Sequence, residues 1–362
     1  MFNRSKITEE NIQTALKTVL HPRTGENVVD SNMVQGMTIK GNKVTVEIVM
    51  FAPSTATETK LNEDIKAAVS AVDGVGSVNV NFSLNIPGDG RMRDLLKTPV
   101  GHVIAVASGK GGVGKSTVAV NLAVALAQAG ARVGLLDADI YGPNVPTMMG
   151  VLQLPPPADN KMTPAFSHGV KIMSIGFLVK PEQPLIWRGP MLHTAIRQFA
   201  SDVQWGELDY MIIDLPPGTG DAPLSVSQSL PVSGGVIVTL PQQVSLDDAR
   251  RGLEMFRQLD IPIFGVVENM SYLELPNGDK VDVFGAGGGK KLAEASGVDY
   301  IGGIPMDPAV RLGGDTGMPV LMSAPQSPVS QALRTISEEV AWRVTQAALA
   351  QQDQAIPINI VG

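Results

Sequence analysis

The sequence predicts a large α/β domain with a doubly wound, mostly parallel sheet, preceded by a small α+β domain. In the second part of the chain, short unbroken apolar runs alternate with helix-length segments, which is typical of parallel strands buried on both faces. In the first part, polar and apolar positions alternate, which is typical of half-buried strands. A length of 362 residues is enough for two such domains.

The small domain is expected over residues 1–84. Segments with helical spacing and segments with alternating spacing follow one another there, and turn residues separate them. The expected elements are a helix over 7–20, a strand over 43–50, a helix over 61–72 and a strand in VGSVNVNFSL. Residues 85–99, which are rich in proline, glycine and charges, are predicted to form a linker.

The large domain is expected over residues 100–352. Its apolar runs are HVIAVAS, ARVGLLD, DYMIID, GGVIVTL, PIFGVVEN and YIGGIP. Because ligands of open α/β sheets bind at the carboxyl ends of the strands, functional residues are expected directly after these runs. Residues 327–352 have the spacing of a helix, and residues 353–362 are expected to be a tail.

The composition argues against several classes of function. A net charge of −7 and the lack of a long run of Lys and Arg argue against nucleic acid as a partner. No apolar stretch is long enough to span a membrane and the N-terminus has no signal-peptide core, so a cytoplasmic protein without membrane contact is expected. The absence of cysteine excludes thiolate metal ligands within the chain. The four histidines are scattered and are assigned no chemistry.

The strongest motif is a glycine-rich loop that satisfies G-x-x-x-x-G-K-[ST]. It follows the run HVIAVAS and opens the helical segment TVAVNLAVALAQAG, so the motif stands in the context that a P-loop NTPase domain requires, and a merely connecting turn is the weaker interpretation. Lys115 supplies a positive charge to the phosphates, and Ser116 is placed to bind Mg²⁺. The residues expected to hold ATP are Gly109, Lys110, Gly111, Gly112, Val113, Gly114, Lys115, Ser116 and Thr117.

Lys110 is not required for holding phosphates and needs its own explanation. Two interpretations stand at this point: a solvated surface lysine, or a cation that neutralises charge on a phosphoryl group across a dimer interface, as an arginine finger does. The string GKGGVGKST resembles the deviant Walker A loop of the MinD/ParA class of dimerising ATPases. The resemblance implies that Lys110 reaches the partner's nucleotide, in a homodimer that encloses two ATP molecules.

The same resemblance assigns roles to two carboxylates at strand ends. Asp139 follows Asp137 at the end of the run in LLDADIYGP, and it looks like the residue that positions the attacking water. Asp214 ends DYMIID and looks like the Walker B carboxylate that serves Mg²⁺. Lys110, Lys115 and Asp139 are thus the expected catalytic residues, and Ser116 and Asp214 the expected metal-binding ones.

Longer strings narrow the resemblance to the Mrp/ApbC family of iron-sulfur cluster carrier ATPases. These strings are DADIYGPNVPTMMG, PLIWRGPML, WGELDYMIIDLPPGTGD, GVVENMSY and VFGAGGGKKLAE, and residues 7–84 look like the small iron-sulfur assembly domain that precedes many such ATPases. The resemblance implies that Asn269 reads the adenine edge and that the loop over 304–308, with Pro305 and Asp307, walls the base. From the residues alone, both features are also compatible with ordinary turn formation.

The sequence departs from the family at the cluster ligands. Members that carry a cluster usually have a C-x-x-C pair between the N-M-S-Y and F-G elements, where this chain reads LELPNGD over 273–279, with Leu275 in the first cysteine's place. The small domain has Ala52-Pro53-Ser54-Thr55 where a cysteine often stands. Carboxylates are poor substitutes for thiolates in such a cluster. Asn277-Gly278 predicts instead a β-hairpin turn that keeps the ribbon without its metal.

The resemblance implies a homodimeric ATPase, with ATP and Mg²⁺ as cofactors, that assembles iron-sulfur clusters or transfers them to apo-proteins. The family predicts a bound cluster, which the lack of cysteine argues against. An alternative is a cysteine-free paralogue that keeps the ATP switch but acts as a scaffold or regulator. DNA partitioning or membrane positioning, as in other members of the MinD/ParA class, is disfavoured by the acidic balance and the lack of a basic C-terminal helix.

Overall fold

The computed structural model describes residues 7–91, 96, 99–140, 142–178 and 189–353, and these form two compact units. The units are Met1–Ile86 and Pro87–Gly362. Part of the segment predicted as a linker over 85–99 packs on the large unit: His102 Nε2 lies 2.8 Å from the Pro87 carbonyl, and Ser233 Oγ donates to Asp89 Oδ2 at 2.6 Å. The tail expected over 353–362 lies outside the described residues after Asp353.

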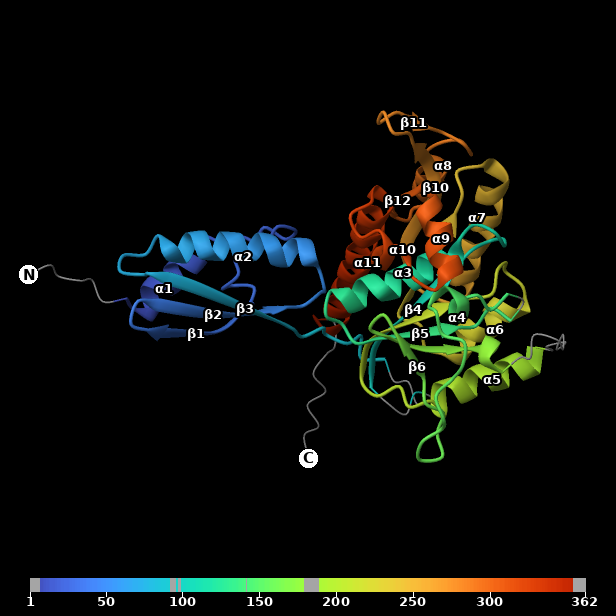
Figure 1. Cartoon of the computed structure of the whole chain (residues 1–362), viewed down its shortest axis with the longest axis horizontal. Coiled ribbons are helices and arrows are strands. Elements are labelled where there is room, and N and C mark those ends of the chain that lie inside the picture. Colours follow the sequence, from blue (N-terminus) through green and yellow to red (C-terminus); the bar gives the residue numbers. More distant parts are fainter. Residues whose placement is uncertain (1–6, 92–95, 97–98, 141, 179–188, 354–362) are drawn as a thin grey trace, which may run out of the picture. The chain divides into compact units, whose positions relative to one another are not determined.

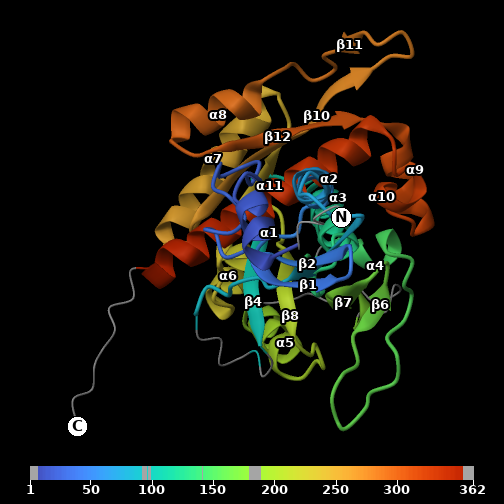
Figure 2. The ribbon, with the colours of Figure 1, turned by 90° about the vertical axis from the view of Figure 1, so that its left-hand side faces the viewer.

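The small unit is a three-stranded sheet with its helices on one core (Figures 1 and 2). Its elements are α1 (Glu9–Leu16), β1 (Val34–Lys40), β2 (Lys43–Met50), α2 (Thr55–Ser70) and β3 (Ser77–Leu84). The sheet order is β1-β2-β3, with β1 antiparallel and β3 parallel to β2. Buried Leu61 and Ile65 of α2 pack in one cluster with Val46 and Ile48 of β2.

The helix predicted over 61–72 begins earlier, at Thr55, because the preceding residue caps it. The Ser54 side chain accepts a hydrogen bond from the Thr57 amide at 3.1 Å, as an N-cap serine does. Strand β1 was not among the predicted elements. Its burial is intermediate or exposed at every position, so its sequence carries no clean alternation.

The large unit is built on a nine-stranded sheet in the order β11-β10-β9-β4-β8-β5-β7-β6, with β12 beside β10. All six predicted runs are strands, and neighbours among them pair in parallel, which confirms the doubly wound α/β prediction. The strands are β4 (Val100–Ala107), β5 (Val133–Asp137), β6 (Ala165–Ser167), β7 (Val170–Ser174), β8 (Leu208–Asp214), β9 (Gly234–Thr239), β10 (Ile263–Glu274), β11 (Lys280–Val281) and β12 (Tyr300–Met306).

Helices cover the sheet on both faces and seal its core (Figure 2). They are α3 (Lys115–Gln128), α4 (Val145–Met148), α5 (Gly189–Ser201), α6 (Asp221–Ser229), α7 (Gln243–Gln258), α8 (Gly288–Ser296), α9 (Pro308–Thr316), α10 (Val320–Ser323) and α11 (Pro328–Asp353). The positions of β5 and β9 are buried throughout, as expected for strands covered on both sides. No helix in the described parts of the chain is long and apolar enough to cross a membrane.

The predicted hairpin at Asn277-Gly278 is confirmed. Strand β10 continues past the sheet and pairs with β11 in antiparallel register, Leu273 with Val281 and Glu274 with Lys280. The turn is closed by a bond from the Gly278 amide to the Leu275 carbonyl at 2.8 Å, and Gly278 has a φ of +86° that favours glycine. Figure 1 shows this hairpin projecting beyond the rest of the large unit.

Candidate functional site

The site begins at the loop between β4 and α3, whose shape requires glycine. Gly114 precedes α3 with a φ of +84°, and a Cβ atom there would lie 2.1 Å from Asn269 Nδ2. The first amides of α3 have no partner within the helix and carry the positive end of its dipole. The loop therefore presents backbone N–H groups where phosphate oxygens bind in other P-loops.

Lys115 lies under this loop in a buried ion pair. Its ammonium nitrogen is 2.7 Å from Asp214 Oδ1 at the end of β8 and 3.6 Å from Asp139 Oδ2 after β5. The Ser116 hydroxyl lies 3.3 Å from the same nitrogen. The structure thus brings together four of the residues that the sequence indicated for chemistry, although they stand up to 99 positions apart in the chain.

Asp137 was not assigned a role from the sequence, yet it holds the site's carboxylates in place. It pairs in register with Asp214 across β5 and β8 and is fully buried. Its Oδ1 accepts from the Asp139 amide at 3.0 Å, and its Oδ2 accepts from Ser174 Oγ at 2.8 Å. Burial, reinforced by the nearby Asp214 carboxylate, raises the pKa of Asp137 to about 8. Burial also raises the pKa of Asp214, and the Lys115 charge opposes that shift.

The oxygen atoms around Lys115 fit a magnesium ion bound together with phosphates. Asp214 Oδ2 is buried and has no hydrogen-bond partner among the described residues, and the Ser116 hydroxyl is close by. In the same parts of the chain, no group of three or more His, Cys, Asp or Glu side chains could hold a metal ion by itself. Mg²⁺ commonly takes one or two protein ligands and completes its shell with waters and phosphates, which agrees with this donor set.

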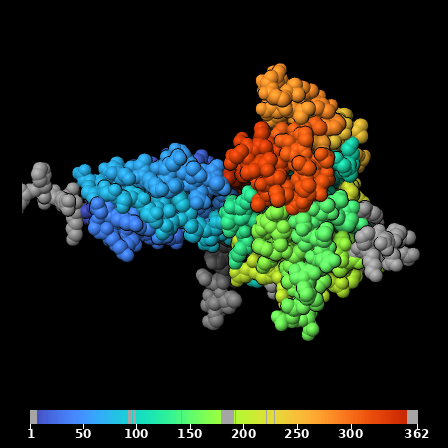
Figure 3. All heavy atoms as spheres, viewed as in Figure 1, coloured from blue at the N-terminus to red at the C-terminus, as the bar shows by residue number. Residues whose placement is uncertain are grey.

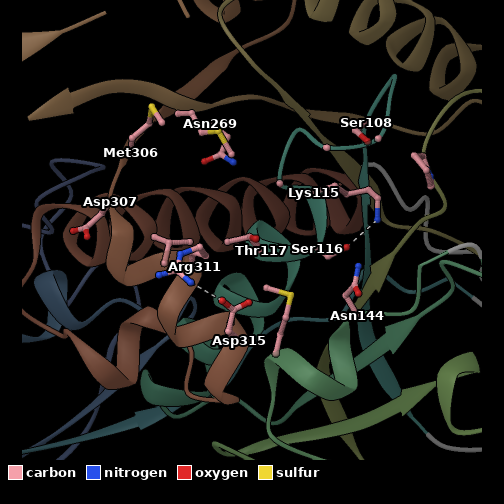
Figure 4. Close-up of a pocket in the computed structure, with 18 of the residues that line it drawn as sticks. Ser108, Lys115, Ser116, Thr117, Asn144, Asn269, Met306, Asp307, Arg311 and Asp315 are labelled. Atoms are coloured by element: carbon pink, nitrogen blue, oxygen red, sulfur yellow. Dashed lines mark hydrogen bonds and ion pairs between the residues drawn. The ribbon is translucent and has the colours of Figure 1, made fainter. Parts of the chain in front are cut away.

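A cavity of about 800 Å³ extends from the loop toward β10, β12 and α9. Figure 4 shows its two ends, with Lys115 and Ser116 on one side and Met306 and Asp307 on the other. The residues expected to bind the base, Asn269, Pro305 and Asp307, all line it. The volume and the mixture of apolar wall with a few polar groups are typical of small-molecule sites.

Asn269 and Asp307 each make a structural hydrogen bond as well. The Asn269 amide nitrogen donates to the Val113 carbonyl at 2.8 Å and so ties β10 to the glycine-rich loop. Asp307 Oδ1 accepts from the Ala309 amide at 2.8 Å and caps α9. Asn269 and Asp307 thus have the local structural role that the sequence left open as an alternative. Both residues also line the cavity.

Lys110 is half-buried on the wall of the same cavity. Its carbonyl accepts from Ser108 Oγ at 2.9 Å, which fixes the loop beneath it. Within the described residues, its ammonium makes no ion pair within 4.0 Å. A lysine that has a fixed backbone and no ion pair with the described residues fits a cation that acts on a ligand.

Several residues of the cavity wall were not found from the sequence. They include Ser108, Asn144, Thr147, Met148, Met270, Arg311 and Asp315. Arg311 and Asp315 stand four residues apart, and this spacing places both on one face of a helix. The spacing is the only feature of the sequence that could have indicated them as a pair. What the sequence could not show is that this face of α9 turns toward the glycine-rich loop.

The fold and the site together define a P-loop nucleotide-binding protein of the MinD/ParA-like class. A family model described as NUBPL iron-transfer P-loop NTPase matches residues 99–341, and one described as iron-sulfur cluster assembly protein matches residues 9–82. The iron-sulfur cluster carrier protein of Synechocystis sp. is 46% identical over 352 residues, which is 95% of this chain and 99% of that protein. The chain belongs to the Mrp/ApbC family of iron-sulfur cluster carriers.

Solved structures agree with this assignment. A nucleotide-binding protein from Archaeoglobus fulgidus, in complex with ADP, is 41% identical with a TM-score of 0.54 and covers 60% of this chain and 87% of its own. The cell division ATPase MinD of Pyrococcus furiosus is 25% identical with a TM-score of 0.52, over 66% of this chain and 98% of its own. The resemblance drawn from the sequence strings is thereby confirmed at the level of family and fold.

Replacing Gly109 by alanine is expected to destabilise the large unit. A Cβ atom at Gly109 would lie 2.0 Å from the Asp248 carbonyl carbon and oxygen in the backbone of α7, which cannot move aside alone. Such overpacking costs about 1–3 kcal/mol. Gly111 is the matched control, because a Cβ there meets nothing within 4 Å. Urea unfolding of the nucleotide-free protein should show a lower free energy of unfolding for Gly109→Ala only. Equal stability of both variants would contradict the close packing at Gly109.

The raised pKa of Asp137 predicts a pH-dependent stability. The carboxyl group binds its proton more tightly in the folded chain than in the unfolded one, so the stabilisation is lost as the pH rises from 3.8 toward about 8. Asp137→Asn, which cannot ionise, should flatten the fall in unfolding free energy as the pH rises from 6 to 8. Urea titrations at both pH values measure this. Asp64→Asn, an exposed control, should keep the wild-type slope, and a wild-type slope in Asp137→Asn would sink the assignment.

Proposed function

We propose that this chain is a homodimeric ATPase that assembles iron-sulfur clusters or transfers them to apo-proteins. The observation that supports it most strongly is the ion pair of buried Lys115 and Asp214, with Ser116 beside it, under a P-loop. Relatives named iron-sulfur cluster carrier protein match nearly the full chain, so both units have counterparts in those proteins. The acidic net charge of −7 favours protein partners in the cytoplasm over nucleic acid or anionic membranes.

In this proposal the loop and Lys115 hold the ATP phosphates, and Thr117 lies beside them on the cavity wall. Ser116 would bind Mg²⁺ directly and Asp214 would bind it through a water molecule. The bound ion would neutralise charge on the phosphates. Asp139, fixed through its amide by Asp137, orients the water that attacks the γ-phosphorus while the bond to the β-phosphate oxygen breaks and ADP leaves.

Lys110 completes the site of the other protomer in the proposed dimer. Lys110 lines the cavity near the phosphate end, and its ammonium makes no ion pair with a carboxylate among the described residues. A cation supplied in this way neutralises charge that develops only in the transition state, so it raises turnover more than affinity. In this proposal adenine binds between Asn269 and the wall formed by Pro305 and Asp307, all of which line the cavity.

The lack of ligands for an iron-sulfur cluster supports a second possible function. The hairpin over 273–279 contains no sulfur ligand, and the whole chain has no cysteine. Glu274 and Asp279 offer only hard oxygen ligands, which are poorly matched to an iron-sulfur cluster. A scaffold or regulator that keeps the ATP switch and binds cluster-assembly partners is therefore the alternative. If the chain does carry a cluster, the thiolates come from a partner protein or a small thiol, whereas the scaffold or regulator carries none.

The two P-loop lysines are expected to separate binding from turnover. Lys115→Ala should abolish retention of ATP, because it removes the charge under the phosphates. Lys110→Ala should bind ATP normally and lose turnover by about a thousandfold or more, the usual loss for a finger residue. Calorimetric titration with ATP and a phosphate-release assay measure the two effects. Equal loss of affinity in both variants would remove Lys110 from the proposed role in the partner site.

Anaerobic reconstitution with iron and sulfide separates carriage from scaffolding. The purified full chain alone should show no cluster absorbance, because it has no thiolate. Addition of a small thiol or of a cysteine-containing apo-protein should restore absorbance and bound iron if the chain carries clusters with external ligands. Absence of a cluster under every condition, with ATP turnover intact, would favour the scaffold or regulator. A cluster on the chain alone would contradict the inference that external thiolates are needed.

A further inference from the structure

One charged pair in the cavity has no part in the proposed hydrolysis. Arg311 and Asp315 lie four residues apart on α9, and Arg311 Nη1 is 2.9 Å from Asp315 Oδ2. Both side chains line the cavity. Figure 4 shows them projecting from α9 between Asp307 on one side and Thr117 and Ser116 on the other.

The simplest role for such a pair would be stabilisation of the helix, and it is a weak one here. Arg311 and Asp315 are 73% and 62% exposed, and solvated pairs at this spacing contribute about 0.3–0.5 kcal/mol. Their place on the cavity wall gives them a second possibility. The neighbouring wall is mostly apolar, with Met148, Pro305 and Met306, so the pair supplies charge where few polar groups fix a ligand's orientation.

The position of the pair matches one part of a nucleotide. The phosphates belong at Lys115 and Ser116, and the wall that receives the base is formed by Pro305 and Asp307. A sugar joins these two parts in every nucleoside triphosphate, so it must cross the stretch of cavity in between. Arg311 and Asp315 line this cavity, and Figure 4 draws Arg311 with Asp307 on one side and Ser116 on the other, and Asp315 beside it. The sugar would face this part of the wall.

Asp307 and Asp315 each have one oxygen engaged, and they differ in the partner: Asp307 holds a backbone amide of α9, whereas Asp315 is paired with a charged side chain of the same cavity wall. Asp307 uses Oδ1 to cap α9. Asp315 accepts from Arg311 through Oδ2, and an ionised carboxylate has capacity for further donors. Ribose offers two such donors, its 2′ and 3′ hydroxyl groups.

We propose that Asp315 accepts a hydrogen bond from a ribose hydroxyl of the bound nucleotide, with Arg311 fixing the carboxylate, so that the site distinguishes ATP from the analogue that lacks that hydroxyl. This inference rests on the proposed function, because it concerns the same ATP site. Asp315 acts on binding and takes no part in the transfer of the phosphoryl group.

Calorimetric titration of the full chain with ATP, 2′-deoxy-ATP and 3′-deoxy-ATP tests the proposal. The wild type should bind ATP about tenfold more tightly than at least one deoxy analogue, the factor that a hydrogen bond to a charged group supplies. Asp315→Ala should weaken ATP by that factor and leave the weaker analogue unchanged, so that the ratio of the two dissociation constants falls to about one. Asp315→Asn, which keeps an acceptor oxygen, should recover part of the ratio.

A matched control is Asp64→Ala, which removes the acid of another exposed i,i+4 pair, Lys60 with Asp64, in the small unit. It should keep the wild-type ratio. Equal affinity of the wild type for all three nucleotides, or a wild-type ratio in Asp315→Ala, overturns the ribose contact while ATP binding stands. Equal weakening of all three by Asp315→Ala would indicate a structural role and also overturn it. Failure of the wild type to bind any of them would instead overturn the proposed function.

Discussion

The buried ion pair between Lys115 and Asp214 is the interaction on which the site depends. It joins the first residue of α3 to the last residue of β8, at the centre of the sheet and at 2.7 Å. A buried pair of this kind costs several kcal/mol when one member is removed, because the other charge is left without a partner. The pair therefore fixes the glycine-rich loop against the carboxyl edge of the sheet, and the positions of Asp139 and Ser116 follow from it.

The sheet explains why these residues could be anticipated. Parallel strands covered on both faces must be continuously apolar, so β4, β5, β8, β9, β10 and β12 stand out as runs in the sequence. Their carboxyl ends then meet at one edge, which gathers Asp139, Asp214 and Asn269. Strands β6 and β7 escaped prediction because they are short and lie toward the sheet edge, where the apolar run is brief. The capped start of α2 at Ser54 shows how a local hydrogen bond moves a boundary that periodicity alone misplaces.

Within the site, the sequence indicated the groups that belong to a motif and missed those defined only by long-range contact. The loop residues were readable because glycine and lysine spacing is dictated by backbone geometry around phosphates. Ser174 and Asp137 were not, since their function depends on a bond across neighbouring strands. Arg311 and Asp315 were likewise invisible as site residues, because their helical spacing does not tell which way the helix faces.

The contact with the P-loop and the cysteine-free hairpin lie at different parts of strand β10. Strand β10 supplies Asn269 to the cavity wall and then continues into the hairpin that it forms with β11, with Gly278 in the turn. At the cavity, Asn269 bonds to the loop through Val113 and is held by the packed sheet. At the hairpin, Leu275 and Val281 are partly exposed, so substitution there meets little resistance from packing. Thiolates could therefore be exchanged for apolar residues at the tip without disturbing the nucleotide site, which is why an intact P-loop carries no information about how a cluster is held.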